Sequence, residues 1–202
     1  MIRNFIFDLG GVLIDFDPDK TLKALYAPED AAFIKKNVFQ TREWSEIDRG
    51  VLTPDEAFSH LSSQMEPAVF HKMMDMVNNW GNYMPPFEDT FDFVKKVKAA
   101  GYKIYLLSNI PLYFYSIKDS IPALSLFDGF VISAEEKVIK PDPAIFRVLL
   151  ERFGLKAEEC VFIDDMPRNT RGAEACGLHG CCFSNHDFNA LYADLKALGV
   201  NL

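Results

Sequence analysis

The sequence lacks the features that mark membrane, secreted and zinc-finger proteins. No apolar run is long enough to cross a bilayer, and no basic stretch leads into an apolar signal segment at the N-terminus. The four cysteines show no zinc-ligand spacing, and the adjacent Cys181 and Cys182 lie in an apolar segment, as small hydrophobic residues of a strand would. We therefore expect a cytoplasmic protein whose cysteines are reduced and structural.

The sequence also lacks an excess of basic residues. It has 21 lysines and arginines against 29 aspartates and glutamates, which gives a formal net charge of −8. A general nucleic-acid binder usually needs a basic face, so we expect neither a nucleic-acid nor a membrane partner. Phosphorylated small molecules stay possible, because a few local cations or one metal ion can reverse the field inside a pocket. Sequence does not determine the oligomeric state, for which we expect a monomer or a weak homodimer.

Short apolar runs alternate with amphipathic stretches along much of the chain, in which 49% of the residues are hydrophobic. This alternation predicts an α/β fold with a doubly wound, mostly parallel, Rossmann-like sheet. The predicted strands lie at residues 5–7, 103–107, 130–132, 161–163 and 179–183, and the helices that connect them at 87–100, 143–153, 169–176 and after 187.

One long segment interrupts the alternation, because residues 16–83 lack strand signals and show helix-like patterning. Proline and capping-box signals predict several helix starts within it, for example Thr53-Pro54-Asp55-Glu56. A Pro-Pro pair at 85–86 marks the return to alternation. We therefore expect an α/β core made of residues 1–15 and 84–202, with a helical insert at 16–83.

The first predicted strand leads into Phe-Asp-Leu-Gly-Gly-Val-Leu at residues 7–13. Asp8 follows an apolar run, so it lies at the carboxyl end of the strand, where open α/β sheets bind their ligands. The two glycines after it allow a sharp turn and bring bare backbone close to whatever binds there. Asp8 is therefore a candidate nucleophile, metal ligand or both. The alternative is that it only caps a turn.

Polar residues also follow two other predicted strands, as Ser108-Asn109 and Asp164-Asp165, and Lys140-Pro141 precedes a helix. The carboxyl ends of parallel strands lie at one edge of a sheet, so these residues can converge on Asp8. Each has a simpler interpretation: a turn for Ser108-Asn109, a solvated surface lysine for Lys140, and a helix cap for the aspartate pair.

Together these residues predict a site for a phosphate ester and a hard divalent cation. Magnesium prefers carboxylate oxygens together with water and substrate phosphate. Asp8, Asp165 and the carbonyl of Gly10 could supply such oxygens. The remaining charge on the phosphoryl oxygens could be neutralised by Ser108, the amide of Asn109 and the ammonium of Lys140.

These motifs resemble those of the haloacid dehalogenase superfamily. The matching elements are Phe-Asp-Leu-Gly-Gly-Val, Leu-Leu-Ser-Asn, Lys-Pro-Asp-Pro and Ile-Asp-Asp followed by Asn169, and they occur in family order across the whole core. The resemblance implies that the helical insert is a small cap domain that closes over the substrate. It also implies a hydrolase that forms a covalent phospho-aspartate, which water then hydrolyses.

The resemblance assigns roles to the site residues. Asp8 would form the phospho-aspartate, and Ser108 and Lys140 would bind the phosphate. Magnesium would be held by Asp8, the Gly10 carbonyl and Asp165, with Asp164 nearby, directly or through water.

One position departs from the family pattern. Phosphatases of this family usually carry a second aspartate two residues after the nucleophile, as general acid and base, and this chain has Gly10 there. The leaving group could need little protonation, as in an anomeric or acyl phosphate. Another group could act instead, such as Asp15, Asp17, Glu46 or Asp48. The enzyme could also be weak or inactive. A similar stretch in the sugar-1-phosphate phosphatase branch, Asp-Leu-Gly-Asn, favours the first two explanations.

The insert contributes further candidates for the pocket: Trp44, Glu46, Asp48 and Arg49, which precede Gly50. Alternatively, Trp44 packs the insert internally and the residues before the glycine form a helix stop. We expect a magnesium-dependent phosphatase that acts on a small phosphorylated metabolite, for example a sugar phosphate. The alternatives are a carbon–halogen hydrolase of the same fold, against which the aspartate pair argues, and a catalytically silent binding or regulatory protein.

Overall fold

The computed structural model describes all 202 residues and contains one five-stranded sheet. The strands are β1 (Asn4–Phe7), β2 (Lys103–Ser108), β3 (Gly129–Ile132), β4 (Cys160–Asp164) and β5 (His179–Cys182). Their order is β3-β2-β1-β4-β5, and all four pairings are parallel. This confirms the doubly wound α/β fold that the sequence predicts, with β1 at the centre of the sheet.

The order of the strands explains where a site can form. From β1 the chain builds the sheet outward through β2 and β3, and then returns to build the other side through β4 and β5. Phe7 at the end of β1 pairs with Leu106 of β2 and with Ile163 of β4. The residues that follow these three strands therefore meet at one edge, at the point where the order of strands reverses.

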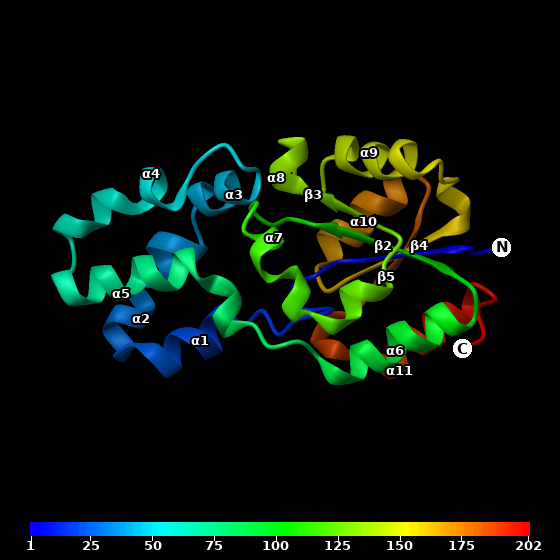
Figure 1. Ribbon diagram of the computed structural model, residues 1–202, viewed down its shortest axis with the longest axis horizontal. Coiled ribbons are helices and arrows are strands. Elements are labelled where there is room, and N and C mark those ends of the chain that lie inside the picture. Colours follow the sequence, from blue (N-terminus) through cyan, green and yellow to red (C-terminus); the bar gives the residue numbers. More distant parts are fainter.

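Helices cover both faces of the sheet (Figure 1). One side carries α6 (Glu88–Ala99) and α11 (Phe188–Ala197), and the other carries α8 (Ser133–Glu136), α9 (Pro143–Phe153) and α10 (Pro167–Ala175). Between β2 and β3 the chain forms α7 (Phe114–Ile117) and two 3-10 turns, Lys118–Ser120 and Pro122–Leu126. Further 3-10 turns span Ala157–Glu159 and Ser184–His186. No helix combines the length and apolar character that crossing a bilayer requires.

The central strand is buried on both faces, as parallel sheets require. Successive side chains of a strand point to opposite faces, so Phe5 and Phe7 lie on one side and Ile6 on the other. Phe5 and Phe7 pack against Phe93 of α6, with ring centroids 6.4 and 6.1 Å apart. Ile6 belongs to a second core cluster together with Phe146 of α9. The strand that carries the first motif is thus held rigidly between two apolar layers.

Residues 18–83 contain helices only, and Figure 1 shows them gathered at one end of the molecule, beyond the sheet. They are α1 (Pro18–Leu25), α2 (Pro28–Ile34), a π-helical turn (Lys35–Phe39), α3 (Arg42–Asp48), α4 (Pro54–Phe58), a 3-10 turn (Ser59–Ser63), α5 (Pro67–Asn78) and a second 3-10 turn (Trp80–Tyr83). We call this part the helical segment.

The chain enters and leaves the helical segment along two adjacent backbone stretches. Ile14 forms an antiparallel bridge with Pro86, and the N–H of Asp15 donates to the carbonyl of Pro85 at 2.9 Å. These contacts lie close to the predicted boundaries. The division into a core and an independent cap domain stays a prediction.

Two helix-capping signals in the sequence form the hydrogen bonds expected of them. Thr53 accepts from the N–H of Glu56 at 3.3 Å, and the Glu56 carboxylate accepts from the N–H of Thr53 at 2.8 Å, which completes the capping box. Asp187 caps α11. The short helices α7 and α8 were not predicted, because four residues carry too little periodicity to be read from a sequence.

Candidate active site

Asp8 follows β1 directly and is largely buried. Its N–H donates to the carbonyl of Ile163 on β4 at 2.9 Å, which fixes the backbone beside the neighbouring strand. Its Oδ1 accepts from the N–H of Leu9 and lies 2.7 Å from Nζ of Lys140. Both contacts use the same oxygen, so Oδ2 is the carboxylate oxygen that stays available.

The second glycine of the motif, Gly11, is required because the backbone there lies close to Asp165. Gly11 has φ +71°, and a Cβ added there would lie 2.7 Å from both Cγ and Oδ2 of Asp165. Only a residue without a side chain lets the turn after β1 lie directly against this aspartate. Gly11 thereby brings the end of β1 and the end of β4 into one site.

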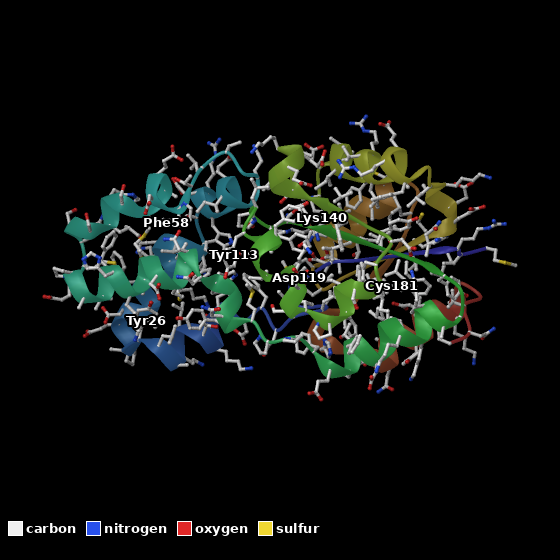
Figure 2. All side chains as sticks on the ribbon, viewed as in Figure 1. Tyr26, Phe58, Tyr113, Asp119, Lys140 and Cys181 are labelled. Atoms are coloured by element: carbon white, nitrogen blue, oxygen red, sulfur yellow. The ribbon has the colours of Figure 1, made fainter.

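Lys140 is one of the most deeply buried residues of the protein, with 1% of its surface exposed. Its ammonium lies 2.7 Å from Asp8 and 2.7 Å from Asp164. Figure 2 shows Lys140 in the sheet part of the molecule, near its junction with the helical segment. The interpretation of Lys140 as a solvated surface lysine is wrong, because such burial requires paired charges.

Asn109 holds the backbone of Lys140 in place. Its Oδ1 accepts from the N–H of Lys140 at 2.8 Å, and its Nδ2 donates to the carbonyl of the same residue at 3.1 Å. The side-chain amide of Asn109 is therefore occupied with positioning the lysine. Ser108, one residue earlier, is buried at the end of β2 and lines the same cavity as Asp8.

Asp164 and Asp165 occupy different positions. Asp164 is fully buried, and its oxygens accept from Lys140, from Nδ2 of Asn169 at 3.0 and 3.1 Å, and from the N–H of Met166 at 2.8 Å. Asp165 is half-buried and faces the cavity. Ligand oxygens of Asp8, Asp164 and Asp165 lie within 4.8 Å of one another.

The electrostatics of this cluster favour a cation. Burial raises the pKa of Asp8 to about 7, and the nearby Asp164 and Asp165 add to the effect while Lys140 opposes it. Burial and then Asp164 raise the pKa of Asp165 to about 6. Burial alone would lower the pKa of Lys140, but its two carboxylate partners outweigh this and raise it. Three carboxylates around one ammonium leave an excess of negative charge, and their hard oxygens suit magnesium.

A cavity of about 850 Å³ opens above this edge of the sheet and is shared with the helical segment. All but one of the predicted site residues line it, namely Asp8, Gly10, Ser108, Asn109, Lys140 and Asp165. Asp164 lies behind them, outside the cavity wall.

The cavity has an apolar wall made of Phe39, Trp44 and Trp80 from the helical segment and of Phe16, which directly precedes this segment. Trp44 contacts Phe39 with ring centroids 4.6 Å apart and Trp80 at 5.7 Å, so it packs the segment and lines the cavity at once. Nothing in the sequence identifies Phe16, Phe39 or Trp80 as cavity residues, because aromatic residues on short helices are usually core.

Two of the four cavity candidates from the helical segment reach it. Trp44 and Asp48 line the cavity, whereas Glu46 and Arg49 do not. Glu46 forms ion pairs with Arg42 at 3.4 Å and with Arg49 at 3.5 Å.

Comparisons with known proteins identify the family of the chain. A family model for haloacid dehalogenase-like hydrolases matches residues 2–177. A sesquiterpene phosphatase, astK, from Aspergillus oryzae is 27% identical over 87% of this chain and 86% of its own length. A D-ribitol-5-phosphate phosphatase from Bacteroides thetaiotaomicron is 26% identical over 84% of this chain and 85% of its own.

A crystal structure shows the same fold. It is that of an enzyme of the same family from Bacteroides thetaiotaomicron, in complex with magnesium and inorganic phosphate. The TM-score is 0.72 at 23% identity, over 95% of this chain and all of that one. The expectation of a phosphoric monoester hydrolase with this fold agrees with these similarities. The chain therefore belongs to the haloacid dehalogenase-like hydrolase family.

Proposed function

We propose that the protein is a magnesium-dependent phosphatase that hydrolyses a small phosphate monoester through a phosphoryl group carried on Asp8. The observation that supports this most directly is the convergence of Asp8 and Asp165 with Lys140 and Ser108 on one cavity. Anionic and cationic groups together suit a phosphate dianion and its counter-ion. The two phosphatases that are similar over more than four fifths of both chains support the same reaction class.

The residues present fit a magnesium ion. Asp8 and Asp165 supply carboxylate oxygens, and the Gly10 carbonyl lies on the same turn. Asp164 has its oxygens occupied by Lys140, Asn169 and a backbone N–H, so we place it behind the ion, acting through water or through Lys140. When bound, magnesium would offset the charge of the phosphate and so lower its repulsion from the nucleophile.

Asp8 is placed to attack phosphorus through Oδ2. Its Oδ1 is fixed by Leu9 and Lys140, so the free oxygen has a defined direction. Attack forms the Oδ2–phosphorus bond as the bond to the ester oxygen breaks, and water then releases phosphate from Asp8. Lys140 and Ser108 would stabilise the phosphoryl oxygens during both steps, and loss of one such preorganised donor typically costs ~3–4 kcal/mol of barrier.

The residues of the cavity wall would contact the organic half of the substrate. A wall of Phe16, Phe39, Trp44 and Trp80 favours a substrate that buries apolar or flat surface against it. A sugar phosphate, which the sequence suggests, would place hydroxyl groups against these rings. We propose that monoesters with an apolar or aromatic organic half are the better substrates, and a sugar phosphate is the alternative.

The helical segment would act as the cap, because it supplies one wall of the cavity. Closure of the two parts over the substrate would exclude water during transfer. The expected location in the cytoplasm and a monomeric or weakly dimeric state complete the proposal.

The test is phosphate release from a panel of an aryl phosphate, alkyl phosphates and sugar phosphates, with magnesium and with a chelator. Asp8→Asn is the inactive variant, and the matched control is Asp119→Asn, whose side chain is 87% exposed and lies outside the cavity. Turnover that requires both magnesium and Asp8 is expected. Metal-independent release of halide from a haloacid would support the dehalogenase instead. Ligand binding without any turnover would support a silent binding protein.

A further inference from the structure

The position that carries an acid in related phosphatases is closed here. A Cβ added to Gly10 would lie 3.2 Å from Cβ and 3.5 Å from Cγ of Phe16. The ring of Phe16 packs edge-on against Trp80 at 5.0 Å, within the apolar wall. The direction in which a side chain at residue 10 would point is therefore occupied by an aromatic residue. Any proton donor for the leaving group has to come from elsewhere.

Three of the four acids that could replace it are committed to other contacts. Asp15 forms an ion pair with Lys20 at 2.5 Å. Asp17 caps the start of α1 by accepting from the N–H of Lys20 at 3.0 Å. Glu46 is paired with two arginines, Arg42 and Arg49. None of the three lines the cavity.

Asp48 differs from these three acids both in its position and in its contacts. It is the last residue of α3 and lines the cavity together with Asp8, Lys140 and Asp165. Apart from the nucleophile and the proposed magnesium ligand, it is the only acidic side chain in the cavity wall. Its carboxyl group forms no hydrogen bond or ion pair with another residue, so it is free to meet a ligand.

The backbone of Asp48 is fixed by the sheet part of the molecule, although α3 belongs to the helical segment. Its carbonyl accepts from Oγ of Ser133, a fully buried residue at the start of α8. The same Oγ accepts from the N–H of Ile110, two residues after Ser108, at 2.9 Å. The Ser133 hydroxyl thus joins the end of α3 to the loop that follows β2. Figure 1 shows α3 and α8 side by side at this junction.

Two further contacts hold the turn after Asp48. The ammonium of Lys137 donates to the carbonyl of Gly50. Gly50 has φ +72°, and a Cβ there would lie 2.6 Å from the carbonyl oxygen of Ala134. The turn is therefore pressed against α8 and fits only with glycine. The backbone that carries the Asp48 side chain is thus fixed, which suits a residue whose role depends on position.

We propose that Asp48 is the general acid and base of the reaction, delivered from the helical segment in place of the residue that Gly10 lacks. In the first step the proton of the Asp48 carboxyl group passes to the ester oxygen as its bond to phosphorus breaks. In the second step the carboxylate takes a proton from water, while the water oxygen bonds to phosphorus and the bond to Asp8 breaks. Each turnover returns Asp48 to its protonated form.

The environment of Asp48 agrees with this role. Burial, and then the negative charge of Asp8, raise its pKa well above the ordinary value, while Lys140 opposes the shift. A raised pKa favours the protonated form from which a general acid donates. The inference rests on the proposed phosphatase function, which the experiment tests separately.

The experiment compares Asp48→Asn with the wild-type enzyme on phosphate monoesters whose leaving groups differ in acidity. With alkyl phosphates, which need protonation, we expect kcat/KM to fall by about 10²–10⁴-fold. With 4-nitrophenyl phosphate, whose leaving group needs none, we expect the first turnover to change less than about 10-fold. After a burst of 4-nitrophenol, steady-state turnover of this substrate should become slow. The reason is that the variant lacks the base that activates water for hydrolysis of the phosphorylated Asp8.

The matched control is Glu46→Gln, on the same helix but outside the cavity, for which no dependence on the leaving group is expected. Asp48→Ser serves as a second variant if the asparagine variant does not fold, as judged by circular dichroism. Equal losses of kcat/KM on alkyl and aryl phosphates, or no loss of kcat/KM on either, would overturn the assignment of Asp48. Absence of Asp8-dependent turnover in the wild-type enzyme would instead overturn the proposed function.

Discussion

Lys140 and Asp164 form an ion pair at 2.7 Å in which neither side chain has any exposed surface. Removing Asp164 would leave the buried ammonium with Asp8 as its remaining carboxylate partner, and removing one partner of a buried ion pair is strongly destabilising. The pair therefore fixes the lysine that the proposed reaction needs, and it couples the stability of the fold to the site.

Asp164→Ala is expected to lower the free energy of unfolding by about 3–5 kcal/mol. The variant removes a charge partner of Lys140 and the acceptor for Asn169. Urea unfolding monitored by circular dichroism measures this. The matched control, Asp119→Ala, lies on the surface and should change stability by less than about 0.5 kcal/mol. Similar small changes in both variants would show that the pair contributes little.

The glycine beside Asp165 gives a prediction with an internal control. Gly11 and Gly101 both have positive φ, +71° and +87°, but only an added Cβ at Gly11 meets other atoms. Gly101→Ala should therefore show only backbone strain, on the order of 1 kcal/mol. Gly11→Ala should be more destabilising and should also weaken magnesium binding, measured by isothermal titration calorimetry. Equal effects on stability and unchanged magnesium binding would contradict the close approach.

The raised pKa values of Asp8 and Asp165 predict how stability depends on pH without metal. Their folded values of about 7 and about 6 lie above the ordinary 3.8, so the folded state binds protons more tightly between these limits. Their contribution to stability is present below about pH 4 and is lost as the pH rises towards 7.

Asp8→Asn removes one of these groups. Relative to wild type, the variant should gain about 1–3 kcal/mol of stability between pH 4 and 7. Urea unfolding in chelator at several pH values measures the difference. A difference that does not change with pH would show that Asp8 has an ordinary pKa. Magnesium should stabilise the wild-type protein at neutral pH, because it binds only the folded form.

The apolar wall predicts that Trp44→Ala changes KM to different extents for two kinds of substrate. Trp44→Ala removes a ring that lines the cavity between Phe39 and Trp80. We expect KM to rise about 10-fold or more for monoesters with an aromatic organic half. The rise should be much smaller for a small alkyl ester such as methyl phosphate, which is too short to contact the ring. Steady-state kinetics on the two substrates measures the difference. Equal changes would place Trp44 in structural packing only.

The parallel sheet and the meeting of its polar strand ends could be predicted from the sequence, whereas the order of the strands comes from the structure. Asp8, Ser108 and Asp165 each follow a short apolar run, and parallel topology then dictates that they converge. Gly154 and Asp187 mark the end of α9 and the start of α11 by their local chemistry alone. Such signals depend on neighbouring residues, which a sequence records directly.

The remaining parts of the site depend on contacts between residues far apart in the chain. Ser133 lies 85 residues from Asp48, and neither forms part of a pattern that indicates the other. Phe16 closes the position beside Gly10 only because the start of the helical segment folds back over the turn. The choice of Asp48 among four acids likewise requires knowing which ones are already paired.

Phosphorylation of Asp8 during turnover can be observed by mass spectrometry. The enzyme is mixed with excess 4-nitrophenyl phosphate and magnesium, quenched in acid within the first turnovers, and digested for mass spectrometry. We predict one phosphoryl group on the peptide that contains Asp8, absent from Asp8→Asn and from samples with chelator. Steady turnover with no phosphorylated peptide, or continued turnover in Asp8→Asn, would contradict the account.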